Sequence, residues 1–432
     1  MPEPATNTST PRSVHRYLRT SGAPYLSVLF LAVVLSQFAQ YLAPTQVVFK
    51  GQPASVLTEY LLIGAAFALW LLFKPTDLWT PIFRWFLAAL ALLWLITITL
   101  SVAHGDLFNW TAFLAPVAMA MIWLKKPTLK ATFTAGDVFA WGLVAITAAA
   151  QILDILGIRS LNFEGWNRLS IKVWDQFPVL FRITDYLHRW EGPFGNVNYA
   201  GPVGAFLLVY GLFRRGPNRV IFIIVGGLIM GASDARASLM ASAAGVLTAV
   251  ILVPSIGRVR LPVWMRLALA AAFAAIAAFL LVTRDPTWNG RTPIWSSYID
   301  GWSQARIFGV GETGISMALG TGQIPVGASH GHNLIIDPLL RYGAIGAAFV
   351  VFVTAIAIAI ALRAGLRGWG VGAAIMATSL VDGLSEDLVE WRYLSMAVVP
   401  IVLASMLGAH LLEVENPDKQ RSNSEFRIDL RG

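Results

Sequence analysis

The chain has 432 residues, a formal net charge of +8, 56% hydrophobic residues and only 13% charged residues. Soluble domains usually carry about 25% charged residues, and a water-soluble globule of this length could not hide so much apolar surface. Composition therefore excludes a soluble enzyme, a disordered chain and a fibrous protein, and it indicates an all-α polytopic membrane protein. The chain has no cysteine, which excludes disulfides, Cys-zinc sites, iron–sulfur clusters and thiol nucleophiles.

Twelve apolar stretches predict about 12 transmembrane helices, since a span needs about 20 residues. Two of them, 219–233 and 369–381, are short and rich in Gly or Ala, so ten or eleven spans are the alternative counts. The twelve ranges are 25–43, 56–73, 82–101, 107–124, 134–156, 197–213, 219–233, 237–254, 263–282, 333–362, 369–381 and 393–412.

Basic residues mark one side of the membrane, because they gather in the two ends of the chain and in alternate short loops. By the positive-inside rule this side is cytoplasmic. We expect a single transmembrane domain over 25–412, between a cytoplasmic N-terminal tail (1–24) and a cytoplasmic C-terminal tail (413–432). The net charge then reflects topology, and nucleic acid is not an expected partner. The residues that set this orientation are Arg12, Arg16, Arg19, Lys74, Arg84, Lys125, Lys126, Lys130, Arg214, Arg215, Arg219, Arg258, Arg260, Arg266, Arg363, Arg367, Lys419, Arg421, Arg427 and Arg431.

Two connections, 157–196 and 283–332, are much longer than the others, and both fall on the outer face. Loops carried by a rigid scaffold commonly hold the functional residues, so these two extracytoplasmic loops predict where the site lies. Within the first, 171–181 is typical of an amphipathic helix at the membrane surface. The alternative interpretation of this loop is an aromatic belt that only anchors the protein.

The first polar cluster, His188 to Asn198, leads into the span 197–213. Arg189 ends an outer loop, where a cation suits an anion at the membrane surface. Asn196 and Asn198 bracket the start of the helix and could cap it. The plainer alternative is a cap beside an interfacial arginine.

The second cluster, Ser233 to Ser238, is the short outer loop between two spans. Charged residues at such an edge usually have a use, which makes Arg236 a candidate anion ligand. The alternative is that Asp234 and Arg236 simply pair with each other.

The third cluster comprises NGRTPIW (289–295), which contains Arg291, and GVGETG (309–314). The glycines match G-x-G-x-x-G, but no strand–helix–strand unit surrounds them, so a dinucleotide fold is excluded. We expect a glycine-rich loop that turns tightly or contacts a ligand.

The fourth cluster places His332 and Asn333 at the outer mouth of a span, followed after nine intervening residues by Gly343 and after two more by Gly346. The positive end of the helix dipole favours a neutral imidazole, which can act as a general base on a sugar hydroxyl. The glycines would let a neighbouring helix approach closely. A capping histidine with ordinary packing glycines is the alternative.

The helix that follows His332 carries three further informative residues. Asp337 and Arg341 lie four residues apart, which predicts an ion pair that stabilises the helix. Pro338 predicts a kink in the same helix.

Three arginines fall on one face, Arg189, Arg236 and Arg291, and such a group suits a phosphate or diphosphate. The chain has no Asp-x-Asp pair for a metal-bound nucleotide sugar, and nucleotide donors are absent outside the cell. The expected donor is therefore a lipid-linked sugar diphosphate, bound with no metal and no cofactor.

The four clusters, in this order, resemble the O-antigen ligase family, whose signature is shared with bacterial O-antigen polymerases. His332, Asn333, Gly343 and Gly346 match its His-Asn-x9-Gly-x-x-Gly pattern in full. The stretch 189–198 resembles its Arg-x-x-Gly-x-Phe-x-Asn-x-Asn helix start. The likeness covers roughly residues 180–350.

Two further segments carry the resemblance. Gly290 and Arg291, with Trp295 and the 309–311 glycines, resemble the family's Gly-Arg…Trp…Gly-x-Gly stretch. The segment 234–238 lies where the family tends to have Ser-Arg-small, although Ala235 replaces the serine, which weakens the case for Arg236.

The resemblance implies a GT-C-like, metal-independent, inverting glycosyltransferase of the bacterial inner (cytoplasmic) membrane, with its active site on the periplasmic face. It would transfer a glycan from undecaprenyl diphosphate to a lipid- or polymer-linked acceptor on the outer leaflet. His332 would be the general base, and Arg189, Arg291 and Arg236 would bind the diphosphate. Three asparagines would position the acceptor or the loops: Asn333, Asn196 and Asn198.

Two alternatives to a ligase stay open. An O-antigen polymerase would join lipid-linked repeats with the same signature. A transporter or flippase commonly has twelve spans with both termini inside. Against transport, the sequence shows no clear internal repeat, and its polar residues gather at one face and not at the midplane.

Overall fold

The structure is a computed structural model that describes residues 23–42, 47–49, 52–72, 79–105, 114–155, 192–194, 197–233, 235–252, 255–256, 259–260, a few single positions between 262 and 275, 291–325, 331–367, 369–385 and 395–414.

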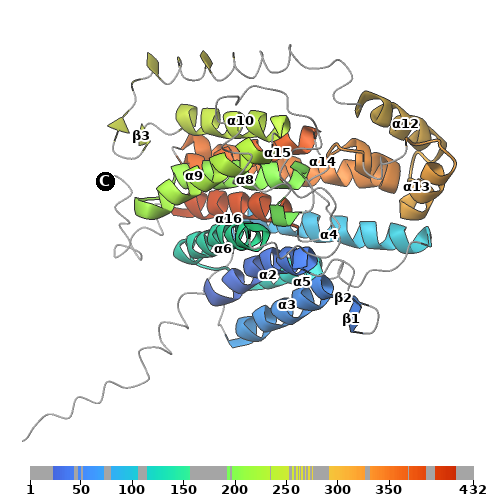
Figure 1. Ribbon diagram of the computed structural model, residues 1–432, viewed down its shortest axis with the longest axis horizontal. Helices are drawn as coiled ribbons and strands as arrows, with labels where there is room; N and C mark the ends of the chain where they lie inside the picture. The colour runs from blue at the N-terminus through green and yellow to red at the C-terminus, as the bar shows by residue number, and fades with distance from the viewer. Residues whose placement is uncertain are drawn as a thin grey trace, which may run out of the picture.

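These residues form helices and two very short antiparallel hairpins (Figure 1). The hairpins are β1 (Val47–Phe49) with β2 (Gln52–Pro53), and β3 (Ser255–Ile256) with β4 (Val259–Arg260). The helices are α2 (Ala23–Leu42), α3 (Ala54–Leu72), α4 (Pro81–Ala103), α5 (Leu114–Leu124), α6 (Leu129–Ile155), the 3-10 turn η4 (Gly192–Phe194), α8 (Val197–Leu212), α9 (Gly216–Ser233), α10 (Arg236–Leu252), α12 (Arg291–Gln304), α13 (Gly311–Gly320), α14 (Ile336–Leu366), α15 (Gly370–Ser385) and α16 (Val398–Val414).

The long helices run side by side as one bundle, and α12 and α13 lie beyond one end of it (Figure 1). Helix α8 packs against α9 and α10, α10 packs against α15, and α14 packs against α4, α15 and α16. Helices α12 and α13 contact the N-terminal part of α14. The second long loop of the sequence, 283–332, thus contains two helices that rest on the start of α14.

The helices have the composition of a membrane protein. Among the described residues, four helices are long and apolar enough to cross a membrane, namely α4, α6, α9 and α14, and seven shorter helices are also apolar. Eleven of the twelve ranges expected from hydropathy coincide with helices. Only a few single positions of the range 263–282 are described, so the count of twelve stays a prediction. The chain is a helical membrane protein.

Two apolar clusters hold the described parts together. The larger runs through the bundle and includes the fully buried Trp94 and Phe139. The smaller lies under α12 and α13 and consists of Tyr298, Ile315, Ile324 and Leu340. Because Leu340 comes from α14, the small cluster fastens α12 and α13 to the first turns of that helix.

Helix α14 is broken at Gly343, where the backbone has φ 66° and ψ −165°. The kink expected at Pro338 is therefore placed wrongly. Pro338 is the third residue of α14, where its missing N–H has no helical acceptor to lose. A left-handed φ is easily adopted only by glycine, so the break lies at the glycine.

The turn between α12 and α13 fills the break in α14. The N–H groups of Ala344 and Ile345 donate to the carbonyls of Arg306 (2.8 Å) and Ile307 (3.3 Å). In return, Val310 N–H donates to the Leu340 carbonyl (2.9 Å). The backbone groups that the break frees on both halves of α14 are thereby satisfied.

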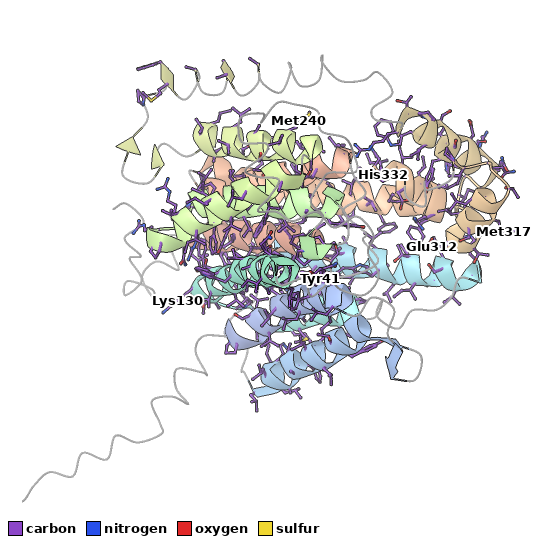
Figure 2. All side chains as sticks on the ribbon, in the orientation of Figure 1. Tyr41, Lys130, Met240, Glu312, Met317 and His332 are labelled. Atoms are coloured by element: carbon purple, nitrogen blue, oxygen red, sulfur yellow. The ribbon has the colours of Figure 1, made fainter. Side chains whose placement is uncertain are left out.

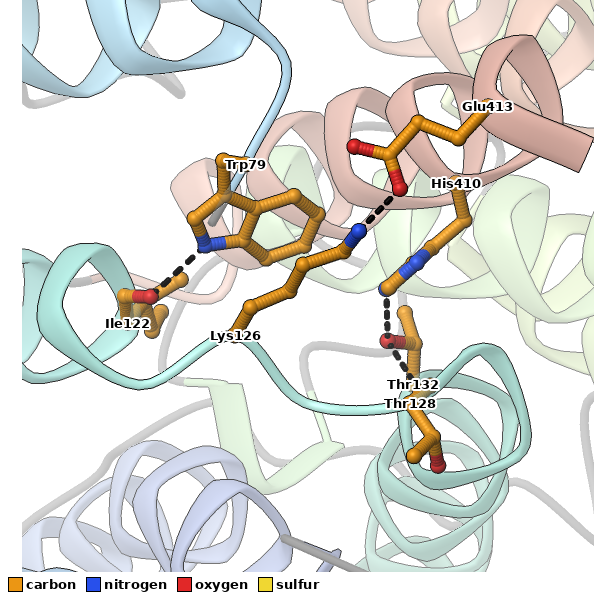
Figure 3. Close-up of polar contacts among 7 residues, drawn as sticks. All are labelled: Trp79, Ile122, Lys126, Thr128, Thr132, His410 and Glu413. Carbon is orange, nitrogen blue, oxygen red and sulfur yellow. Dashed lines mark hydrogen bonds and ion pairs between the residues drawn. The ribbon is translucent and has the colours of Figure 1, made fainter. Parts of the chain in front are cut away.

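The opposite end of the bundle carries a polar cluster between the α5–α6 loop and α16 (Figure 3). The Lys126 ammonium pairs with Glu413 and lies 5.5 Å from the centre of the Trp79 ring. Nearby, Thr132 Oγ1 and His410 Nε2 are hydrogen-bonded at 3.1 Å. These contacts join α16 to α6 and to the segment before α4.

Candidate functional site

The candidate site lies at the end of the bundle away from that polar cluster. Figure 2 shows His332 near α12 and Lys130 at the other end of the helices. Of the residues expected to form the site, His332, Asn333 and Arg291 are described with their side chains. Arg236 and Asn198 are described by their backbone only, as the first residue of α10 and the second of α8. The last two, Arg189 and Asn196, lie outside the described residues.

His332 lies in a tight turn directly before α14. It is the one non-glycine residue of the described chain with a positive φ, 46°, and its side chain is half-buried. Such a conformation costs about 1–3 kcal/mol and persists where surrounding contacts impose it. Here Gly331 N–H donates to Asp337 Oδ1 (2.9 Å), and the Gly331 carbonyl accepts from Trp295 Nε1 (2.9 Å). The residue before His332 is thus held from α14 and from α12.

Asn333 caps α14 and ties it to α15. Its Oδ1 accepts from the N–H groups of Ile335 (2.9 Å) and Ile336 (3.1 Å), and its Nδ2 donates to the Leu384 carbonyl (2.8 Å). Both ends of the amide group are engaged in protein contacts, so its geometry supports positioning of the loop. The adjacent Leu334 N–H donates to a carbonyl of α15 as well.

The ion pair expected between Asp337 and Arg341 is confirmed. Arg341 Nε donates to Asp337 Oδ2 at 2.6 Å, and both side chains are buried. Arg341 Nη1 also pairs with Glu312 of α13. Because Asp337 accepts the Gly331 N–H through its other oxygen, this buried network links α13, α14 and the turn at His332.

Arg291 is the first residue of α12 and is 7% exposed. Trp295 follows it by one helical turn on the same face, and Trp295 is bonded to Gly331 beside His332. The face of α12 that carries Arg291 and Trp295 is therefore the face that meets the turn of His332. A guanidinium at a helix N-terminus, where the dipole is positive, favours an anionic ligand.

The fourth helix of the site is α10, which contributes Ser238 from the segment 233–238. Ser238 Oγ donates to Asp382 Oδ1 on α15 at 3.0 Å, and both residues are buried. Helix α10 can approach α8 closely because a Cβ at Gly201 of α8 would collide with Ala235 and Ser238. Helix α10, which begins with Arg236, is thereby fixed against the same end of α15 that binds Asn333.

Asp382 is the residue that sequence reasoning missed. A carboxylate buried in an apolar helix is costly unless it has a use or a partner, and this rule was the signal available. The predicted span ended at residue 381, which left Asp382 outside it, but α15 continues to Ser385. Its side chain lines an apolar pocket of about 560 Å³, open mouth included, together with Tyr199, Phe206 and Thr378.

Hydrogen bonds therefore connect the N-terminal ends of α10, α12 and α14 with the C-terminal end of α15. They bring together three of the four polar clusters of the sequence, while the first, at 188–198, is described only at Gly192–Phe194 and from Val197 onward. The third cluster turns tightly, since Gly309 and Gly311 have φ of 73° and 67°. The described residues contain no group of three His, Cys, Asp or Glu side chains placed to hold a metal ion.

An arginine, a half-buried histidine and a buried carboxylate on converging helix ends can bind an anion and move a proton. No family model matches the chain, and no curated protein matches it.

Proposed function

We propose that the protein is a membrane glycosyltransferase that resembles the O-antigen ligases. It transfers a glycan from an undecaprenyl-diphosphate-linked donor to an acceptor on the outer leaflet. The observation that carries the proposal is the hydrogen bond from Trp295 to Gly331, because it joins the helix end of Arg291 to the turn of His332. A diphosphate ligand and a general base would then face one reaction site.

The proposed chemistry is a single displacement with inversion. His332 takes the proton from an acceptor hydroxyl, the hydroxyl oxygen attacks the anomeric carbon, and the bond from that carbon to the diphosphate oxygen breaks. Arg291 binds the diphosphate and stabilises its charge as it leaves, without a metal or cofactor. Arg189 and Arg236 assist in this role, Arg236 from the start of α10.

Asp382 is a positioning residue in this mechanism. Through Ser238 it holds α10 against α15, and the residues after it accept hydrogen bonds from the turn of His332. The α10–α15 contact therefore sets where Arg236 stands relative to His332.

We place the enzyme in the bacterial inner membrane, with the site on the periplasmic face and both termini in the cytoplasm. The separation of Lys130 from His332 in Figure 2 supports this orientation, since Lys130 belongs to a basic loop. A reporter fused after Gly314 should behave as periplasmic and one fused after Lys126 as cytoplasmic. The reverse result would put every candidate residue on the cytoplasmic face and overturn the proposal.

The test of the activity is a reconstituted transfer assay with a lipid-linked oligosaccharide. His332→Ala should lower the transfer rate by about 100- to 10,000-fold, the usual contribution of a general base. His330→Ala, two residues away, should have a much smaller effect. Product on a lipid A–core acceptor indicates a ligase, and longer lipid-linked repeats indicate a polymerase. Full transfer by His332→Ala would refute the mechanism.

A further inference from the structure

The turn between α12 and α13, residues 305–310, exposes two large apolar side chains. Ile307 is 58% exposed and Phe308 is 55% exposed, although Gly309 beside them is buried. The turn lies against the break of α14 at Gly343, where a Cβ would stand 2.5 Å from Phe308 N and closer still to the Ile307 carbonyl. These two side chains therefore project from the protein surface at a fixed position along the axis of α14.

The depth of this turn in the membrane follows from counting residues along two helices, starting at their basic ends. The stretch from Gly343 to Leu362, just before Arg363, is about 20 residues and so about 30 Å, the thickness of the hydrocarbon core. On α4, the stretch from Trp85, just after Arg84, to His104 is also about 20 residues. The ring of His104 lies 3.0 Å from the Gly309 carbonyl. Both counts place residues 305–310 at the outer boundary of the hydrocarbon.

Most carbonyls of this turn have partners within the protein, which lowers the cost of placing non-helical backbone beside lipid. Four of them accept from α14, from the end of α4 or from the turn itself, and the N–H groups of Gly309 and Val310 donate inward. The pairs are Ala344 N to Arg306 O, Ile345 N to Ile307 O, Gly309 N to Ala305 O, Val310 N to Leu340 O, and His104 Nε2 with Gly309 O.

The apolar surface of the turn also continues the exposed apolar surface of the helices it touches. Helix α4 exposes Leu95 (51%) and Val102 (56%), and α14 exposes Phe352 (53%). In a membrane helix, such side chains face acyl chains. Ile307 and Phe308 extend this exposed apolar surface at the end of the helices nearest to α12 and α13.

We propose that Ile307 and Phe308 insert into the acyl chains of the outer leaflet and that residues 305–310 form a membrane anchor of the α12–α13 unit. Trp302 and Arg306, just before Ile307 and Phe308, carry side chains that favour the headgroup layer, and the Trp302 indole donates to the Arg306 carbonyl (2.9 Å). The anchor sets α12, and with it Arg291, at a constant height above the hydrocarbon. The inference does not depend on the reaction that the site performs.

The test uses the absence of cysteine in the chain, which makes single-cysteine labels specific. Phe308→Cys, in the full-length protein reconstituted into phosphatidylcholine–phosphatidylglycerol vesicles, is labelled with an environment-sensitive fluorophore. Two matched positions serve as references: Phe352→Cys for lipid, with almost the same exposed fraction, and Gln323→Cys, exposed after α13, for water. Ile307→Cys is the second variant of the anchor.

We expect quenching of the Phe308→Cys label by lipids with a nitroxide near the headgroup end of the acyl chain. The Phe352→Cys label, about 14 Å further along α14, should be quenched most by a nitroxide deep in the acyl chain. Before labelling, the Phe308 cysteine should react with a membrane-impermeant maleimide about tenfold more slowly than the Gln323 cysteine, because interfacial segments bury their apolar face by about 5–10 Å. The proposal is overturned if both anchor cysteines react as fast as Gln323→Cys and show no quenching by nitroxide lipids.

Discussion

Replacing Gly343 with Ala tests the break of α14 directly. In a continuous helix, Gly→Ala would raise stability by about 0.5–1 kcal/mol through helix propensity. At Gly343 the backbone has φ 66° and ψ −165°, a region that only glycine adopts readily. The added methyl group would also meet the Ile307 carbonyl and Phe308 N. A continuous helix and a broken helix therefore predict opposite signs for the change in stability that Gly343→Ala causes.

The magnitude follows from two contributions. Forcing an alanine into this backbone conformation costs about 1–3 kcal/mol. Moving the 305–310 turn aside breaks its hydrogen bonds with Ala344 and Ile345, at about 0.5–1.5 kcal/mol each. Their sum is a loss of about 2–6 kcal/mol in the free energy of unfolding.

The assay is thermal unfolding of the purified protein in detergent, with the monodisperse fraction as readout. Gly227→Ala is the matched control, because Gly227 is a helical glycine of α9 where an added Cβ would meet no atom within 4 Å. Gly343→Ala should melt well below the wild type, and Gly227→Ala at or above it. Equal melting temperatures for the two variants would refute the broken helix.

Three further predictions concern the candidate site and the opposite end of the bundle. Asn333→Ala should lower the free energy of unfolding by about 0.5–2 kcal/mol, because the helix loses its cap. Asn333→Asp should keep the cap and lose only the bond to α15. Equal unfolding temperatures for the Ala and Asp variants would contradict this. Lys126→Met should destabilise by about 3–5 kcal/mol, and adding Glu413→Gln should recover much of the loss in a double-mutant cycle. Arg291→Lys should lower kcat/KM for glycan transfer by roughly 30-fold or more, because Lys lacks the bidentate fork; wild-type kcat/KM would reduce Arg291 to a structural role.

Hydropathy predicted most of the fold, because a long apolar run in a membrane protein has few structures available besides a helix. It failed at the ends of helices. The predicted span 369–381 stopped short because Asp382 lowers local hydropathy, although the carboxylate lies inside α15 with Ser238 as partner. A hydropathy average records only that Asp382 is polar. It does not record the hydrogen-bond partner that makes its burial tolerable, because that partner, Ser238, lies 144 positions away on another helix.

Within the candidate site, one local contact was predictable from the sequence and the backbone geometry was not. The ion pair of Asp337 and Arg341 followed from their spacing along one helix. The break at Gly343 did not, because the sequence around it reads as an ordinary packing glycine. It depends on the turn at 305–310, which lies more than thirty residues earlier and supplies the hydrogen-bond partners that make a broken helix stable.

The break of α14 also divides the molecule mechanically. Residues 336–342 are fastened to α12 and α13 through Leu340 and through the ion pair of Arg341 with Glu312, while the part of α14 after Gly343 packs with α4 and α16. The turn of His332 bridges the two parts, because Gly331 before it is bonded to α12 and α14, while Asn333 and Leu334 after it are bonded to α15. A tilt of α12 and α13 about Gly343 would strain the hydrogen bonds on both sides of His332, so the turn resists a change in the distance between His332 and Arg291.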